Sequence, residues 1–145
     1  MFKHILVPTD GSPRSLHAAK TAAHLASMSG ARITTFHVVP AYTGNVQGTR
    51  YPPADYVSPS DHDEQVRREA DRYLGDVKAV AEAAGVECNG RYARSDFPAE
   101  AIVKAIEQYG CDTVVIGSRR SEGVSKMGSV AQKVLVDARI VVIVT

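Results

Sequence analysis

The sequence has few cysteines, no marked excess of either charge and no long apolar run. Cys88 and Cys111 lie far apart and belong to no Cys-x-x-Cys pair or Cys/His cluster, so they indicate two reduced thiols in preference to a disulfide. The formal net charge is +1, from 17 Lys and Arg against 16 Asp and Glu, which gives no field that would recruit nucleic acid or an anionic membrane. Any partner must therefore be recognised by local features.

Apolar stretches are short throughout the chain. The first of them, residues 5–7, is too short for the core of a signal peptide, and no segment reaches the roughly 18 apolar residues that span a membrane. We therefore expect a cytoplasmic protein with no membrane partner.

Common catalytic motifs are also missing. Ser12, Ser15 and Ser118 lie in no GxSxG elbow, and the chain contains neither a GxxxxGK[ST] phosphate loop nor a GxGxxG sequence after its first apolar run. The five histidines are scattered and predict no metal site. We accordingly expect no catalytic residues and no dedicated enzymatic reaction.

The composition that remains is that of an ordinary globular domain. The chain has 145 residues, of which 44% are hydrophobic and 23% charged. A chain of this length can bury a core of its own, so residues 1–145 are expected to form a single domain.

Apolar runs alternate with amphipathic helical patterns along the whole chain. They predict strands near residues 3–7, 32–39, 86–92, 112–117 and 140–144, and helices near 13–28, 60–84, 98–109 and 129–138. Ser12 followed by Pro13 is a typical helix start. Residues 41–59, rich in proline and glycine, have no sustained period and are expected to form a long mobile loop.

This alternation predicts an α/β fold. Several of the strands are apolar on both faces, which is typical of a parallel sheet covered by helices on each side. Right-handed crossovers then give an open, doubly wound three-layer sandwich, whose ligands bind beyond the carboxyl ends of the strands. The residues at those ends are Pro8-Thr9-Asp10, Val38-Val39 and Gly117-Ser118.

The segment from Gly117 to Ala131 has the composition of a phosphate-binding loop. Arg119, Arg120 and Lys126 supply positive charge, and Gly128-Ser129 opens a helix whose amino terminus attracts anions. Each of these residues also has an ordinary structural explanation, but their coincidence after a central strand favours a phosphate site.

Asp10 has two possible roles. In a nucleotide site it could accept ribose hydroxyls or help to hold a phosphate-bound metal, and otherwise it caps the first helix or its turn. His37 lies inside a strand pattern and is expected to be a core or interface residue.

Four segments together resemble the universal stress protein family, in order and over essentially the full chain. They are residues 5–12 (Ile-Leu-Val-Pro-Thr-Asp-Gly-Ser), 37–39 (His-Val-Val), 112–118 (Asp-Thr-Val-Val-Ile-Gly-Ser) and 128–131 (Gly-Ser-Val-Ala). The resemblance implies a five-stranded parallel sheet of order 3-2-1-4-5, of the adenine nucleotide alpha hydrolase-like type. It also implies a homodimer through the C-terminal strand Ile140 to Val144.

The resemblance further implies an adenine nucleotide, ATP or AMP, as ligand, with Mg²⁺ only beside ATP. Asp10 would contact the ribose and Val38 the adenine through its backbone, while Pro8 and Thr9 would form the rim. The phosphate or ribose region would take Gly117, Ser118, Gly128, Ser129 and Val130. To these family positions we add Arg119 or Arg120, whose charge could take the place of backbone amides.

Members of the family that bind ATP resemble one another in a G-x2-G-x9-G-[ST] loop. Here Gly117 and Gly128-Ser129 match its ends, Arg120 replaces the second glycine, and the separation is two residues shorter. The alternatives are therefore a stress-response domain that binds an adenine nucleotide, and a nucleotide-free dimeric interaction module with a degraded loop. A weak ATP hydrolase or phosphotransferase is a third.

Overall fold

The computed structural model describes residues 2–40, 59–118 and 127–145, and strands and helices alternate through these ranges. The predicted loop at 41–59 lies outside them except for Pro59, as do Arg119, Arg120 and Lys126. The elements are β1 (His4–Pro8), α1 (Pro13–Ser29), β2 (Arg32–Val39), α2 (Pro59–Ala83), β3 (Cys88–Arg94), α3 (Pro98–Tyr109), β4 (Thr113–Ile116), α4 (Ser129–Asp137) and β5 (Val141–Val144).

The strands form one parallel sheet of order β3-β2-β1-β4-β5. From β1 the chain moves outward through β2 to β3, then returns to place β4 on the other side of β1. The direction of winding therefore reverses between β1 and β4, and a crevice opens where the loops after these strands part in opposite directions. The α/β fold class and the strand order are confirmed.

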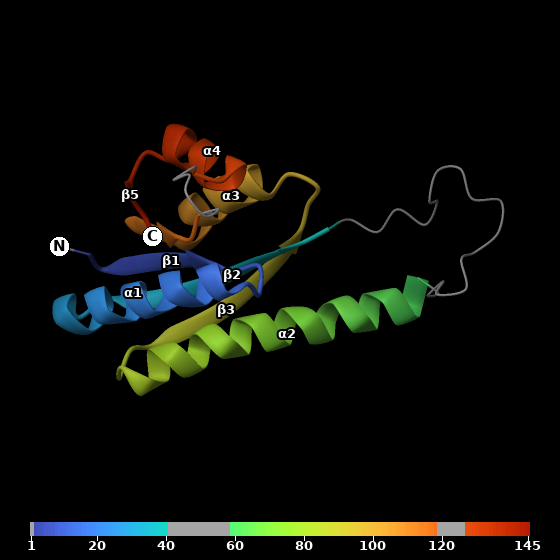
Figure 1. Ribbon diagram of the computed structural model, residues 1–145, viewed down its shortest axis with the longest axis horizontal. Coiled ribbons are helices and arrows are strands. Elements are labelled where there is room, and N and C mark those ends of the chain that lie inside the picture. Colours follow the sequence, from blue (N-terminus) through green and yellow to red (C-terminus); the bar gives the residue numbers. More distant parts are fainter. Residues whose placement is uncertain (1, 41–58, 119–126) are drawn as a thin grey trace, which may run out of the picture.

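The sheet has an apolar core on each face. On one face α1 and α2 pack against Ile5 and Val7, and on the other α3 and α4 pack against Leu6. Successive side chains of a strand point to opposite faces, so an uninterrupted apolar run such as β1 supplies both cores. Figure 1 shows the resulting layers, with α3 and α4 on one side of the central strands and α2 on the other.

Small residues allow α1 to lie close to the sheet. Its buried face is formed by one serine and five alanines (Ser15, Ala18, Ala19, Ala22, Ala23 and Ala26). The helix begins after Ser12, whose hydroxyl accepts the Ser15 amide at 3.2 Å, and ends at Gly30 in the left-handed conformation. Close packing of α1 brings its amino-terminal turn to the carboxyl ends of β1 and β4.

Both cysteines are free thiols. Burial, with the nearby Asp112 carboxylate, raises the pKa of the Cys111 thiol to about 11, so this thiol stays protonated at neutral pH. Among the helices of the described ranges, none is both long and apolar enough to cross a membrane.

Candidate functional site

Two adjoining cavities lie at the carboxyl ends of the strands, where β1 and β4 part. The first has a volume of about 220 Å³ and the second about 250 Å³. Asp10, Ser15, Gly117 and Val130 line both of them. The two cavities therefore meet along a shared wall and could hold two parts of one ligand.

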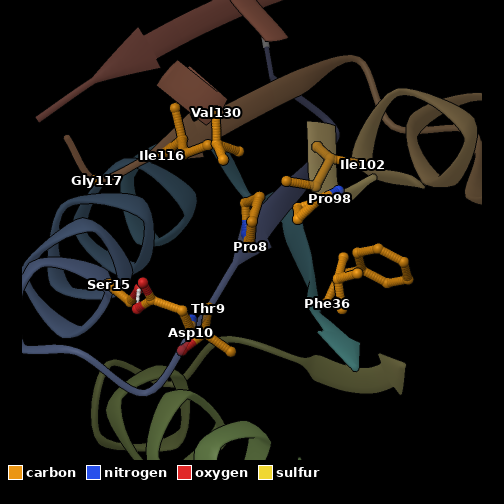
Figure 2. Close-up of a pocket in the computed structure, with 11 residues that line it drawn as sticks. Pro8, Thr9, Asp10, Ser15, Phe36, Pro98, Ile102, Ile116, Gly117 and Val130 are labelled. Carbon is orange, nitrogen blue, oxygen red and sulfur yellow. Dashed lines mark hydrogen bonds between the residues drawn. The ribbon is translucent and has the colours of Figure 1, made fainter. Parts of the chain in front are cut away.

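The first cavity, called the apolar cavity below, is mainly hydrophobic. Figure 2 shows Phe36, Pro98 and Ile102 on one side of Pro8, with Thr9, Asp10 and Ser15 on the other. Ile116, Gly117, Val130 and Val38 complete its lining. Such a space suits a flat, weakly polar group that meets a few polar atoms at one end.

The second cavity, called the polar cavity below, lies between the amino-terminal turns of α1 and α4. Its lining includes Ser12 and Arg14 from the first turn and Gly128–Ala131 from the second. Gly128 caps α4 without any side-chain hydrogen bond. Because the first N–H groups of a helix have no carbonyl partner within it, this turn presents donors and a partial positive charge to the cavity.

Asp10 is held by the turn that joins β1 to α1. Its Oδ1 accepts hydrogen bonds from the Ser12 amide at 2.9 Å and the Ser15 hydroxyl at 2.7 Å. The Ser15 hydroxyl in turn accepts the Asp10 amide at 3.1 Å, so this hydroxyl is engaged on both sides. Oδ1 is thus committed to the turn, whereas Oδ2 lies 3.8 Å from Nη2 of Arg14.

Asp10 is ionised at neutral pH. Partial burial of the carboxyl would raise the pKa of Asp10, but hydrogen bonds from Ser12 and Ser15 and the charge of Arg14 outweigh it and bring that pKa below its ordinary value. The carboxylate can therefore accept hydrogen bonds from ligand hydroxyl groups. It both caps the turn and faces the cavities, so its two predicted roles are compatible.

The other end of this turn is fastened to β2 and α2. The Thr9 amide donates to the Phe36 carbonyl at 2.8 Å, and the Thr9 carbonyl accepts from Nδ1 of His37 at 2.7 Å. The His37 ring meets the Tyr73 ring edge-on, with 5.2 Å between the centroids. His37 thus has a structural role, orienting the turn that carries Asp10.

The predicted site residues divide into three groups. Most line one or both cavities, namely Pro8, Thr9, Asp10, Val38, Gly117, Gly128, Ser129 and Val130. Ser118 lies outside both, because its hydroxyl donates to the Thr145 carbonyl at 3.1 Å and it lines a separate cavity with Pro13 and His17. Arg119 and Arg120 lie outside the described residues.

Sequence reasoning missed several lining residues. Ser12, Arg14, Ser15, Phe36, Pro98, Ile102, Ile116 and Ala131 were not assigned to the site. Pro98 could have been found, since it opens the helix that follows β3 and so lies at the same edge of a parallel sheet. Phe36 and Ile102 carried no such signal, because apolar residues inside regular elements read as ordinary core.

The sequence of the whole chain matches known proteins. The model of the universal stress protein family matches residues 1–145. The universal stress protein YxiE of Bacillus subtilis is 32% identical over 139 residues, covering 92% of each chain. A universal stress protein of Methanocaldococcus jannaschii is 32% identical over 149 residues, covering 99% of this chain and 82% of the relative.

Solved structures agree with this match. A universal stress family protein from Burkholderia pseudomallei has a TM-score of 0.77 at 28% identity, covering 99% of this chain and 95% of the other. Two more distant structures share the fold: an Archaeoglobus fulgidus universal stress protein in complex with dAMP (TM-score 0.69, 22% identity, coverage 98% and 96%) and an Arabidopsis thaliana family protein with AMP bound (TM-score 0.68, 16% identity, coverage 98% and 90%). With sequence match, strand order and fold in agreement, this chain belongs to the universal stress protein family.

Proposed function

We propose that this protein binds an adenine nucleotide, AMP or ATP, across the two cavities, and that binding serves a regulatory role in a stress response. The observation that carries the proposal is the direct junction of an apolar cavity with a polar one at the carboxyl edge of the sheet. A nucleotide has the same division, since an aromatic base is joined through a ribose to an anionic phosphate. The proposed function is binding, without a dedicated reaction.

Each part of the nucleotide has a proposed place. The adenine lies in the apolar cavity beside Ile102 and Phe36 and meets the backbone of Val38, with Pro8 and Thr9 at the rim. The ribose hydroxyls donate to Oδ2 of Asp10, whose Oδ1 is already engaged. The phosphate lies in the polar cavity against the amino terminus of α4.

The bound ligands of structural relatives support this class of nucleotide. Relatives were solved in complex with cAMP, with dAMP and with AMP, all of them adenine nucleotides with one phosphate. Mg²⁺ would enter only beside ATP, where its charge would offset that of the triphosphate.

Titration calorimetry of the full chain with AMP, ATP with and without Mg²⁺, cAMP and GMP tests the proposal. We expect binding of at least one adenine nucleotide and weaker binding of GMP. Asp10→Asn should weaken AMP binding about tenfold, because a hydrogen bond to a charged acceptor is lost. Asp71→Asn makes the same change on the exposed face of α2 and should leave the affinity unchanged.

The result that contradicts the proposal is simple to recognise. If no adenine nucleotide binds at millimolar concentration, nucleotide binding is not the function. The nucleotide-free interaction module then becomes the better hypothesis.

We further propose that the protein is a cytoplasmic homodimer formed through β5. This strand is at an edge of the sheet and pairs with β4, and Val141 within it is 50% exposed. Leu135 and Val136 of α4, which packs beside β5, are exposed as well. Exposed apolar residues at a strand edge are typical of an interface. Two free thiols fit the reducing cytoplasm.

Val141→Glu should convert the dimer to a monomer, because a second copy would have to bury the new carboxylates. We expect the dimer dissociation constant to rise by at least about tenfold. Light scattering after size-exclusion chromatography measures this. Met28→Glu is the control, since Met28 is 68% exposed and lies on α1, which is not part of the proposed interface. A monomeric wild type would show that the proposal is wrong, and a dimeric Val141→Glu would place the interface elsewhere.

A further inference from the structure

We propose that Arg14 of α1 contacts the nucleotide phosphate and makes the site select phosphorylated nucleosides over free ones. This inference rests on the proposed nucleotide binding and adds a residue from the first helix to it. Arg14 lines the polar cavity together with Gly128–Ala131 of α4. Its guanidinium lies beside Asp10, another residue of the same lining.

The backbone of Arg14 is held in place at this wall. A Cβ atom built on Gly117 would lie only 2.7 Å from the Arg14 carbonyl oxygen, so the first turn of α1 packs directly on the end of β4. The Ser15 side chain fastens the same turn to Asp10 at 2.7 Å. A flexible side chain on a fixed backbone can reach into the cavity without a rearrangement of the fold.

The present contact of the guanidinium is weak. Nη2 of Arg14 lies 3.8 Å from Oδ2 of Asp10, which is beyond hydrogen-bond distance, and the two side chains are 41% and 65% exposed. An exposed ion pair of this kind contributes little, because water screens it and both side chains lose freedom in forming it. The Arg14 guanidinium can therefore leave Asp10 readily when a group that binds it more strongly is present.

A bound nucleotide would satisfy both charges. Ribose hydroxyls donate to Oδ2 of Asp10 and replace its contact with Arg14. The released guanidinium then donates to the phosphate next to the ribose, where planar N–H groups match two phosphate oxygens. Adenosine has no phosphate to accept hydrogen bonds from Arg14, so nothing replaces the lost contact with Asp10. Arg14 therefore favours AMP over adenosine.

The test compares AMP with adenosine by calorimetry on the full chain. We expect wild type to prefer AMP, and Arg14→Gln to weaken AMP binding by about tenfold while adenosine affinity changes less than about threefold. Arg14→Lys should restore part of the preference, since it keeps the charge but loses the planar geometry. Added salt should weaken AMP binding more in wild type than in Arg14→Gln.

Arg68→Gln is the matched control, because Arg68 also forms an exposed ion pair with a carboxylate, that of Glu64, but on α2. Equal losses for AMP and adenosine in Arg14→Gln would mean that Arg14 only maintains the turn, and an unchanged AMP affinity would mean that it does not reach the phosphate. Either result overturns this inference while nucleotide binding stands. Wild type that binds neither compound would overturn this inference, and it would overturn the proposed nucleotide binding as well if ATP and cAMP also fail to bind.

Discussion

Gly11→Ala should lower the free energy of unfolding by about 3 to 4 kcal/mol. Two costs add at this position. Gly11 has a φ of +80°, which an L side chain rarely adopts, and a Cβ there would lie 2.4 Å from Cε1 of Tyr73. The Tyr73 ring contacts the His37 ring edge-on, and the Arg72 guanidinium lies 5.1 Å from its centroid, so a displacement of the ring would disturb both contacts.

Gly30→Ala separates these two costs. Gly30 has a nearly equal φ of +72°, but nothing lies within 4 Å of the position of its Cβ. This variant should lose only about 1 kcal/mol, from backbone strain alone. Urea denaturation monitored by circular dichroism gives both values. Equal losses in the two variants would show that Tyr73 does not confine the turn.

Gly117→Ala should weaken AMP binding by about tenfold or more and destabilise the protein by about 2 kcal/mol. The new Cβ would meet backbone atoms of Arg14, with its carbonyl oxygen at 2.7 Å and its carbonyl carbon at 2.9 Å. The backbone at Gly117 and at Arg14 cannot move aside by a change of rotamer, as a side chain can. The end of β4 and the first turn of α1 must therefore move apart. Gly117 lines both cavities, and that movement would displace the walls that hold the base and the phosphate.

Gly75→Ala is the control for this prediction and should change the free energy of unfolding in the opposite direction. Gly75 lies inside α2 with nothing within 4 Å of its Cβ position, so alanine should stabilise the helix by up to about 1 kcal/mol. Calorimetry with AMP and urea denaturation test both variants. If Gly117→Ala binds AMP as wild type does, the two cavities are not the nucleotide site.

The regular elements could be predicted because their signals are local. Ile5, Leu6 and Val7 read as a buried strand, and Ser12-Pro13 read as a helix start, from neighbouring residues alone. Candidate positions such as Asp10 and Gly117 followed from one further rule, that ligands bind beyond the carboxyl ends of parallel strands. The structure places these two residues on the wall between the cavities.

Other features could not be predicted because they depend on contacts between distant segments. The Gly11 turn is confined by Tyr73 of α2, and no pattern near either residue indicates the other. Ser118 follows a strand, as a site residue should, yet its hydroxyl donates to Thr145. Phe36 and Ile102 look like core residues in sequence and differ only in that a cavity lies beside them.

The sequence by itself determined the α/β alternation, the strand ends at which a ligand could bind, and the likeness to the universal stress protein family. Hydrophobic period, capping residues and turn residues act within a few positions, so they can be read along the chain. Only the tertiary structure decided that Arg14, Asp10 and the start of α4 face one cavity, because the packing of α1 against β4 at Gly117 sets those distances. That packing results from contacts along whole faces of the sheet, which no single segment encodes.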